Sequence, residues 1–126
     1  MSEPIGSVTV RTSPTRSRLV LSGEVDMSLA EELSAAVDNV LAVGLPVDVD
    51  VRDVTFLDSS GLSKIVRLAT SSTTRTRLIE PPDFVLFLLE VTRMDEVLDV
   101  VENDPGFPDG DPASDAAGLG GQRDAV

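Results

Sequence analysis

The chain has 126 residues, carries a net charge of −12, and contains neither cysteine nor histidine. Its length and its 41% hydrophobic content predict a single globular domain. The negative charge argues against binding to nucleic acid or to an anionic membrane surface, because both need basic patches. The missing residue types exclude thiolate nucleophiles, cysteine-ligated metal centres and imidazole catalysis. We therefore expect a protein that is not an enzyme and holds no cofactor or metal of its own.

The first half of the chain predicts a hairpin, a helix and a strand. Residues 7–11 and 18–23 are short alternating runs separated by a polar turn, which is typical of a β-hairpin. The apolar residues that follow Ser28 recur with the helical period, and Ser28 and Glu31 fit a capping box at the start of this helix. Residues 47–51 alternate strictly, which predicts a strand with one buried face.

The acidic residues in and after this strand invite a second interpretation. Asp48, Asp50, Asp53 and Asp58 could hold a metal ion or include a phosphorylated aspartate, as in response-regulator receivers. A receiver also needs a lysine late in the fold, and the only lysine is Lys64, inside a predicted helix. We therefore interpret Asp48 and Asp50 as the solvated side of the strand.

The segment after the strand predicts a connector followed by a second helix. The connector covers residues 53–58, and we expect Phe56 and Leu57 in it to point inward. The helix begins near Ser60, where apolar residues again follow the helical period. The Ser/Thr-rich stretch 70–76 ends it.

A strand, a third helix and a last strand complete the predicted domain. Residues 77–79 form the strand, and Pro81-Pro82-Asp83 is typical of a helix start. The run 84–89 is entirely apolar and fits a buried strand or a helix by pattern, and its proline start favours the helix. Such a helix needs deep burial or an external partner, and we interpret it as a core helix. Residues 98–101 predict the final strand. The order β-β-α-β-α-β-α-β is typical of an α/β domain with a mixed sheet.

The composition changes after Asn103. Residues 104–126 contain three proline, five glycine and five aspartate residues, with few large apolar side chains. Such a segment buries too little apolar surface to offset its ordering entropy. We therefore predict one domain over residues 7–103 and a disordered acidic tail over residues 104–126.

The turn before the second helix is the candidate functional segment. Asp58, Ser59 and Ser60 carry the residue types that cap helices, and a simple cap is one interpretation. The other is that one serine accepts a phosphate, because a helix N-terminus tolerates an anion and a strand-to-helix turn is exposed. A hydrolase nucleophile is excluded, since the chain has no histidine to activate a serine and no G-x-S-x-G turn surrounds it.

Three blocks in this order resemble the anti-sigma factor antagonists of the STAS-domain family. They are Gly23-Glu24-Val25-Asp26, the run Asp53-Val54-Thr55-Phe56-Leu57-Asp58-Ser59-Ser60-Gly61-Leu62, and Thr92-Arg93-Met94-Asp95-Glu96-Val97. In the third block, Arg93 stands where the family commonly has glycine. The resemblance implies a STAS-like mixed sheet with helices mainly on one face.

The resemblance also implies a partner-switching mechanism. The unphosphorylated protein would bind an anti-sigma factor of the serine-kinase type and so free a sigma factor. The kinase would phosphorylate Ser59 and end the complex, and a metal-dependent, PP2C-type phosphatase would reset it. The partner-binding residues would be Asp26, Asp58, Ser59, Ser60 and Gly61. Since no apolar run reaches the length of a membrane helix, we expect this phosphoprotein to act in the cytoplasm.

Two alternatives stay open at this point. The chain could be a STAS scaffold that does not switch, or a subunit of a larger complex such as a lipid-transport or stressosome-like assembly. It could also be a module that binds a small molecule or a nucleotide, although no glycine-rich phosphate loop supports this alternative.

Overall fold

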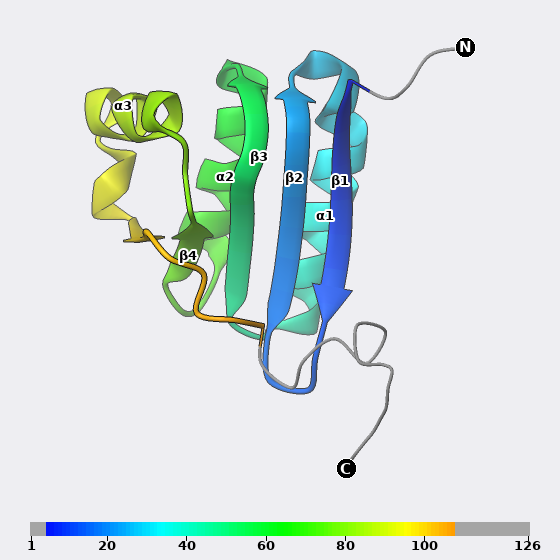
Figure 1. Ribbon diagram of the computed structural model, residues 1–126. Coiled ribbons are helices and arrows are strands. Elements are labelled where there is room, and N and C mark those ends of the chain that lie inside the picture. Colours follow the sequence, from blue (N-terminus) through cyan, green and yellow to red (C-terminus); the bar gives the residue numbers. More distant parts are fainter. Residues whose placement is uncertain (1–4, 108–126) are drawn as a thin grey trace.

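The computed structural model describes residues 5–107, which form one five-stranded sheet and three α-helices (Figure 1). The strand order is β1-β2-β3-β4-β5; β1 is antiparallel to β2, and the other neighbouring pairs are parallel. The predicted α/β architecture and order of elements are confirmed. The elements are β1 (Gly6–Thr12), β2 (Ser17–Val25), the 3₁₀ helix η1 (Met27–Leu29), α1 (Ala30–Val43), β3 (Val47–Leu57), α2 (Ser59–Ser71), β4 (Thr76–Ile79), α3 (Asp83–Thr92), the 3₁₀ helix η2 (Met94–Glu96) and β5 (Leu98–Val101).

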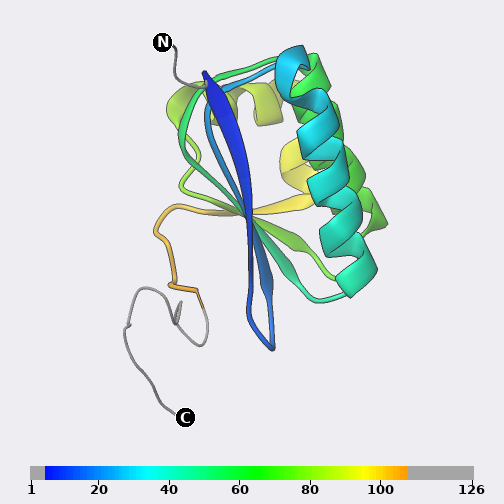
Figure 2. The same cartoon turned by 90° about the vertical axis from the view of Figure 1, so that its right-hand side faces the viewer.

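The core lies between the sheet and two of the helices. Helices α1 and α2 lie side by side on one face of the sheet, as Figure 2 shows from the edge. Leu33, Val37 and Val40 from α1 and Ile65 and Leu68 from α2 are buried against the strands. These positions follow the helical period, so the apolar stripe of each helix explains why it covers this face. No helix within residues 5–107 is long and apolar enough to cross a membrane.

The start of α1 differs from the prediction. Asp26 caps η1, because its carboxylate accepts hydrogen bonds from the Ser28 N–H over 3.0 Å and from the Ser28 hydroxyl over 2.6 Å. Leu29 is the N-cap of α1 and gives no side-chain hydrogen bond. The predicted capping box of Ser28 and Glu31 is therefore wrong, since a carboxylate two residues earlier already binds the hydroxyl. Gly44 has φ 79° and closes α1 in the left-handed region.

Strand β3 is longer than predicted. It stays paired with β2 as far as Leu57, which lies opposite Val25. The predicted connector over residues 53–58 is therefore almost entirely strand. Leu57 is buried as expected, but Phe56 is 48% exposed. Alternation inside β3 is interrupted where the pairing register with β2 shifts, and this is why a strict two-residue period failed to predict it.

Helix α3 is present where predicted, but it is not a core helix. Only Val85 and Leu89 are buried, whereas Phe87 and Val91 are more than 60% exposed. The helix lies beyond the C-terminal end of β4, at the edge of the sheet that is far from β1 (Figure 1). It ends at Arg93, which has φ 65°. The left-handed conformation explains why glycine suits this position.

Buried ion pairs occupy the face of the sheet that α1 and α2 leave uncovered. Asp48 is fully buried, and Asp50 is nearly so. The prediction that these carboxylates form a solvated face is therefore wrong. The cause is a row of paired residues across three strands, in which Arg18 of β2 lies opposite Asp48 of β3 and Asp48 lies opposite Arg77 of β4.

Three guanidinium groups surround the Asp48 carboxylate. Arg77 donates to both oxygens over 2.8 and 3.0 Å, Arg16 donates over 2.7 Å and Arg18 over 3.0 Å. Burial raises the pKa of Asp48, but the hydrogen bonds from Arg77 and Arg18 and the charge of Arg16 outweigh it, so the net pKa is lowered. Asp50 holds Arg52 in a similar way, with Arg52 Nε 3.0 Å from one carboxylate oxygen.

The segment after β5 completes this cluster. We call residues 102–107 the C-terminal arm; it crosses the helix-free face from β5 toward β2 (Figures 1 and 2). Its Asp104 accepts two hydrogen bonds from Arg18, over 2.9 and 3.0 Å, and one from Arg52. Phe107 lies under the guanidinium groups of Arg11 and Arg18, 5.0 and 5.5 Å from its ring centre.

The arm lies beyond the predicted boundary between domain and tail. Composition predicts a disordered tail from residue 104, yet Asp104 is tied to the sheet by charged hydrogen bonds from Arg18 and Arg52. These ionised contacts hold the short segment where its apolar content cannot. The rest of the predicted disordered acidic tail, residues 108–126, lies outside the described residues.

Replacing Asp48 tests the buried cluster. The Asp48→Asn change leaves three guanidinium groups beside a neutral side chain, and we expect the free energy of unfolding to fall by about 3 kcal/mol. Urea titration at neutral pH measures this loss. Asp99→Asn is the matched control, because Asp99 pairs with Arg75 at a half-exposed site, and it should cost less than about 1 kcal/mol. Equal losses in the two variants would contradict the structural role of Asp48.

The arm predicts a specific acid sensitivity. Hydrogen bonds from Arg18 lower the pKa of Asp104 far below its ordinary value, so its contribution is complete above the unfolded-state pKa near 4 and is lost only as the pH falls from there toward the lowered folded-state pKa. We expect Asp104→Asn to lose about 1–2 kcal/mol at pH 7 and to approach wild type only in strong acid. Urea midpoints measured from pH 7 down to the strongest acid in which the wild type stays folded test this. An exposed-site variant, Asp53→Asn, should follow the wild-type curve throughout, and a constant gap for Asp104→Asn would refute the ion pair.

Candidate functional site

Two loops lie side by side at the C-terminal edge of the parallel strands. Strand β2 ends at Val25 and β3 ends at Leu57, and these residues are paired in the sheet. The next residues along the chain, Asp26 and Asp58, therefore begin neighbouring loops. The Asp58 N–H donates to the Val25 carbonyl over 3.2 Å, which joins the two loops directly. The structure thus brings together the candidate residues of both blocks, although they are far apart in the sequence.

Asp58 caps helix α2 with its side chain. Its carboxylate oxygen accepts a hydrogen bond from the Gly61 N–H over 3.0 Å and a second from the Ser60 hydroxyl over 2.6 Å. The extended backbone of Asp58, with φ −101° and ψ −175°, is usual for an N-cap. Asp26 and Ser28 repeat this arrangement on the neighbouring loop, with the same 2.6 Å hydroxyl hydrogen bond. The two loops therefore share one local structure, an aspartate that binds the hydroxyl of the serine two residues later.

The two serines of the α2 loop have different roles in this geometry. The Ser60 hydroxyl is half-buried and donates to Asp58. Ser59 is the first residue of α2, is exposed, and its hydroxyl has no hydrogen-bond partner within residues 5–107. The residue types alone left open which serine was available to chemistry, and the family resemblance implied Ser59. Among the described residues, Ser59 has the hydroxyl of this pair that makes no hydrogen bond.

Gly61 is buried and supports the loop from beneath. A methyl group at its α-carbon would lie 2.7 Å from a side-chain carbon of Val25 and 2.9 Å from the Val25 carbonyl oxygen. Only glycine lets α2 approach the end of β2 this closely. Gly61 therefore sets the position of the surface, while Asp58 and Ser59 are the residues that lie on it.

The carboxylate of the cap keeps its charge. The hydrogen bond from the Ser60 hydroxyl, followed by that from the Gly61 N–H, lowers the pKa of Asp58 below its ordinary value. The Met27 N–H adds a smaller contribution from the neighbouring loop. A negative charge therefore stands permanently beside Ser59. Across residues 5–107, no group of three histidine, cysteine, aspartate or glutamate side chains is placed to bind a metal ion.

Sequence reasoning missed two apolar residues at this site. Met27 is 75% exposed on the first loop, and Phe56 is 48% exposed just before the second. A signal for Met27 was present in the repeated spacing Asp26-Met27-Ser28 and Asp58-Ser59-Ser60. No comparable signal existed for Phe56, because its exposure depends on the register shift between β2 and β3.

Known structures resemble this fold over most of its length. An anti-sigma factor antagonist from Mycobacterium paratuberculosis superposes with a TM-score of 0.71 at 24% sequence identity, covering 80% of this chain and 90% of that chain. The unphosphorylated form of the anti-sigma factor antagonist SpoIIAA superposes with a TM-score of 0.61 at 17% identity, covering 88% and 96%. At these identities the likeness establishes the fold.

The family itself is established at the level of sequence. A search of curated protein sequences gave no match. A family model described as "Mlab, STAS domain" matches residues 8–102, which include all five strands from Val8 onward and both aspartate loops. The predicted family is confirmed by this match and by the shared fold: the chain belongs to the STAS-domain family.

Proposed function

We propose that this chain is an anti-sigma factor antagonist that is switched off by phosphorylation of Ser59. The observation that carries the proposal is the exposed Ser59 hydroxyl, which makes no hydrogen bond to any residue from 5 to 107, beside a second serine whose hydroxyl is bound by Asp58. The two structural neighbours, both named as anti-sigma factor antagonists, support the general role. The binding surface consists of Asp26, Asp58, Ser59 and Ser60, positioned by the buried Gly61.

The switch acts through local charge. Phosphate on Ser59 adds about −1.5 to −2 charges next to the ionised Asp58. The first turn of α2 tolerates this anion, because free N–H groups and the helix dipole favour it there. The helix therefore stays folded. A partner surface that accommodates the Asp58 carboxylate alone would face this carboxylate and the phosphate on Ser59 together. The exposed side chains of Met27 and Phe56 give the unphosphorylated surface its apolar contact area.

The partners supply the chemistry. A serine-kinase anti-sigma factor brings ATP and its metal, and a metal-dependent, PP2C-type phosphatase removes the phosphate. The chain is their substrate, and it acts in the cytoplasm as a phosphoprotein in partner switching.

A kinase assay and a binding assay test this function. The full chain is incubated with ATP and candidate serine-kinase anti-sigma factors, and mass spectrometry locates the phosphate, which we expect on Ser59 alone. Ser59→Glu should weaken binding to the same anti-sigma factor by about tenfold or more, because like charges face each other. Ser71→Glu is the control, since it adds the same charge at the exposed far end of α2 and should bind as wild type.

Two results would overturn the proposal. One is phosphate on another residue, with Ser59 unmodified. The other is a Ser59→Glu variant that binds as tightly as wild type. The second result would favour a STAS scaffold that does not switch.

The contact between α2 and β2 gives a separate prediction. Gly61→Ala should lower the free energy of unfolding by about 1–3 kcal/mol, because the added methyl group overlaps Val25. Ser63→Ala, on the exposed side of the same helix, should change it by less than about 0.5 kcal/mol. Thermal and urea unfolding measure both values. If Gly61→Ala is as stable as Ser63→Ala, the packing of α2 against β2 is looser than described.

A further inference from the structure

Helix α3 exposes more apolar surface than its position in the fold requires. Seven of its ten residues are apolar, yet only Val85 and Leu89 are buried. Phe87 is 63% exposed and Val91 is 62% exposed. A contiguous apolar surface of this kind on a helix is typical of a contact site.

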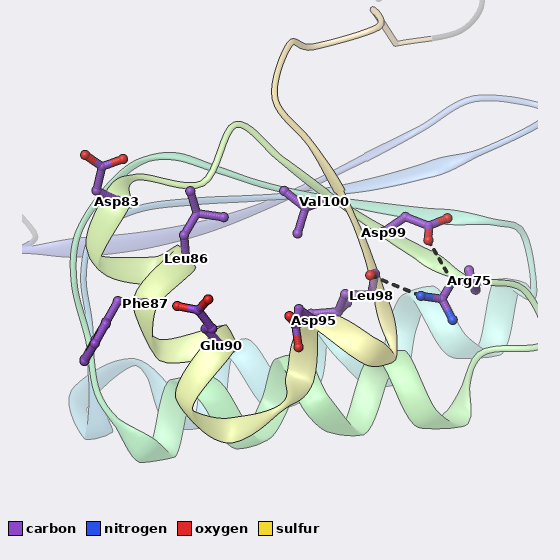
Figure 3. Close-up of a pocket in the computed structure, with 9 residues that line it drawn as sticks. All are labelled: Arg75, Asp83, Leu86, Phe87, Glu90, Asp95, Leu98, Asp99 and Val100. Atoms are coloured by element: carbon purple, nitrogen blue, oxygen red, sulfur yellow. Dashed lines mark hydrogen bonds and ion pairs between the residues drawn. The ribbon is translucent and has the colours of Figure 1, made fainter.

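A groove runs between this helix and the edge of the sheet. It has a volume of about 790 Å³, and Figure 3 shows its two sides. Leu86, Phe87 and Glu90 of α3 lie on one side, and residues 98–100 of β5 lie on the other. In the part of the chain that the structure describes, strand β5 pairs with β4 alone, so its outer edge faces no other strand. The groove therefore combines apolar side chains with an unpaired strand edge.

Negative charge surrounds the apolar part. Asp83, Glu90 and Asp95 line the groove, and none of them has a salt bridge within the described part of the chain. The only basic residue among the lining residues is Arg75, which is already paired with Asp99 over 2.7 Å. Three uncompensated carboxylates thus border the apolar surface.

We propose that the groove between α3 and β5 binds a segment of a partner protein that carries lysine or arginine next to apolar side chains. The apolar side chains of the segment cover Leu86 and Phe87, and its cations pair with Asp83, Glu90 and Asp95. Complementary charge favours such a segment over others, because it both guides the encounter and discriminates against acidic sequences.

Other occupants fit this charge poorly. A second copy would bring the same carboxylates to a symmetric contact, where they repel one another. The residues that follow the C-terminal arm carry four aspartates and one arginine, and the arm leads to Phe107 beside Arg11 of β1, at the opposite edge of the sheet from β5. The carboxylates of the groove also repel an anionic lipid surface.

This surface is separate from the one proposed for switching. None of the lining residues belongs to the loops that begin at Asp26 and Asp58. A partner in the groove would therefore bind whether or not Ser59 is phosphorylated. The inference consequently does not depend on the proposed function.

Synthetic peptides provide the test. The probe is a 14-residue peptide with leucine and lysine at amphipathic helical spacing; one comparison peptide has glutamate in place of every lysine, and a second has serine in place of every leucine. Each is titrated into the ¹⁵N-labelled full chain and followed by amide chemical shifts. We expect the leucine–lysine peptide alone to bind, with shifts at Leu86, Phe87 and Val100 and none at residues 58–61.

Two variants assign the binding to the groove. The affinity for the leucine–lysine peptide should fall about tenfold in the triple variant Asp83→Asn, Glu90→Gln and Asp95→Asn. Phe87→Ser should weaken it by a similar factor, and Phe87 is exposed enough that the fold should remain intact, as thermal unfolding will check. A control with three exposed carboxylates neutralised elsewhere, Glu31→Gln, Glu32→Gln and Asp53→Asn, should bind as wild type.

Three results would overturn the proposal. The first is an absence of shifts in the groove. The second is that the peptide with serine in place of leucine binds as tightly as the leucine–lysine peptide, which would indicate charge attraction without apolar contact in the groove. The third is a concentration-dependent dimer in sedimentation that the Phe87→Ser change abolishes, which would assign the groove to a second copy of the chain.

Discussion

A carboxylate without access to water, that of Asp48, organises the helix-free face of the sheet. Arg18 and Arg77 lie on either side of it in one row across β2, β3 and β4. Buried ion pairs contribute little net stability compared with apolar packing, but an unpaired buried charge is costly. A slip of β3 by one residue would put a valine in this row and leave the arginines without their carboxylate. The cluster therefore constrains the register of the parallel strands.

The functional edge of the sheet depends on this register and on two shifts that follow it. Arg18 lies opposite Asp48 near one end of the strands, and after the two register shifts Val25 lies opposite Leu57 at the other end. The loops that follow carry Asp26 and Asp58, and they can meet only because the strands end together. The position of the exposed Ser59 beside the ionised Asp58 therefore depends on the pairing of the strands. Gly61 then brings α2 close enough for the Asp58 cap to form.

The local sequence pattern was sufficient to predict the helices, but it did not predict which side chains are buried and which are exposed. The helical period predicted α1 and α2, because it reflects each helix's own sequence, and the proline start predicted α3. Neither signal could predict that α3 would leave Phe87 exposed, since that depends on where the helix lies against the sheet. The burial of Asp48 depends on arginines about 30 residues away on both sides of it. The predicted strand ranges did not fix the register, since aligning their first residues would set Arg18 opposite Val47, whereas Arg18 pairs with Asp48. The residue types did not distinguish Ser59 from Ser60; the family resemblance named Ser59, and the hydrogen bond from Ser60 to Asp58 adds a physical reason.

The C-terminal arm links the last strand, β5, to the centre of the sheet. Strand β5 has four residues and one neighbour, so in isolation it would fray from the edge of the sheet. The arm continues from its end across the sheet and ties Asp104 to Arg18 on β2, and the Asp104 N–H to Glu80 at the end of β4. Opening the edge strand therefore requires breaking contacts at the centre of the sheet. A four-residue edge strand is thus coupled to the centre of the sheet, and the two edges of the domain are expected to open as one cooperative unit.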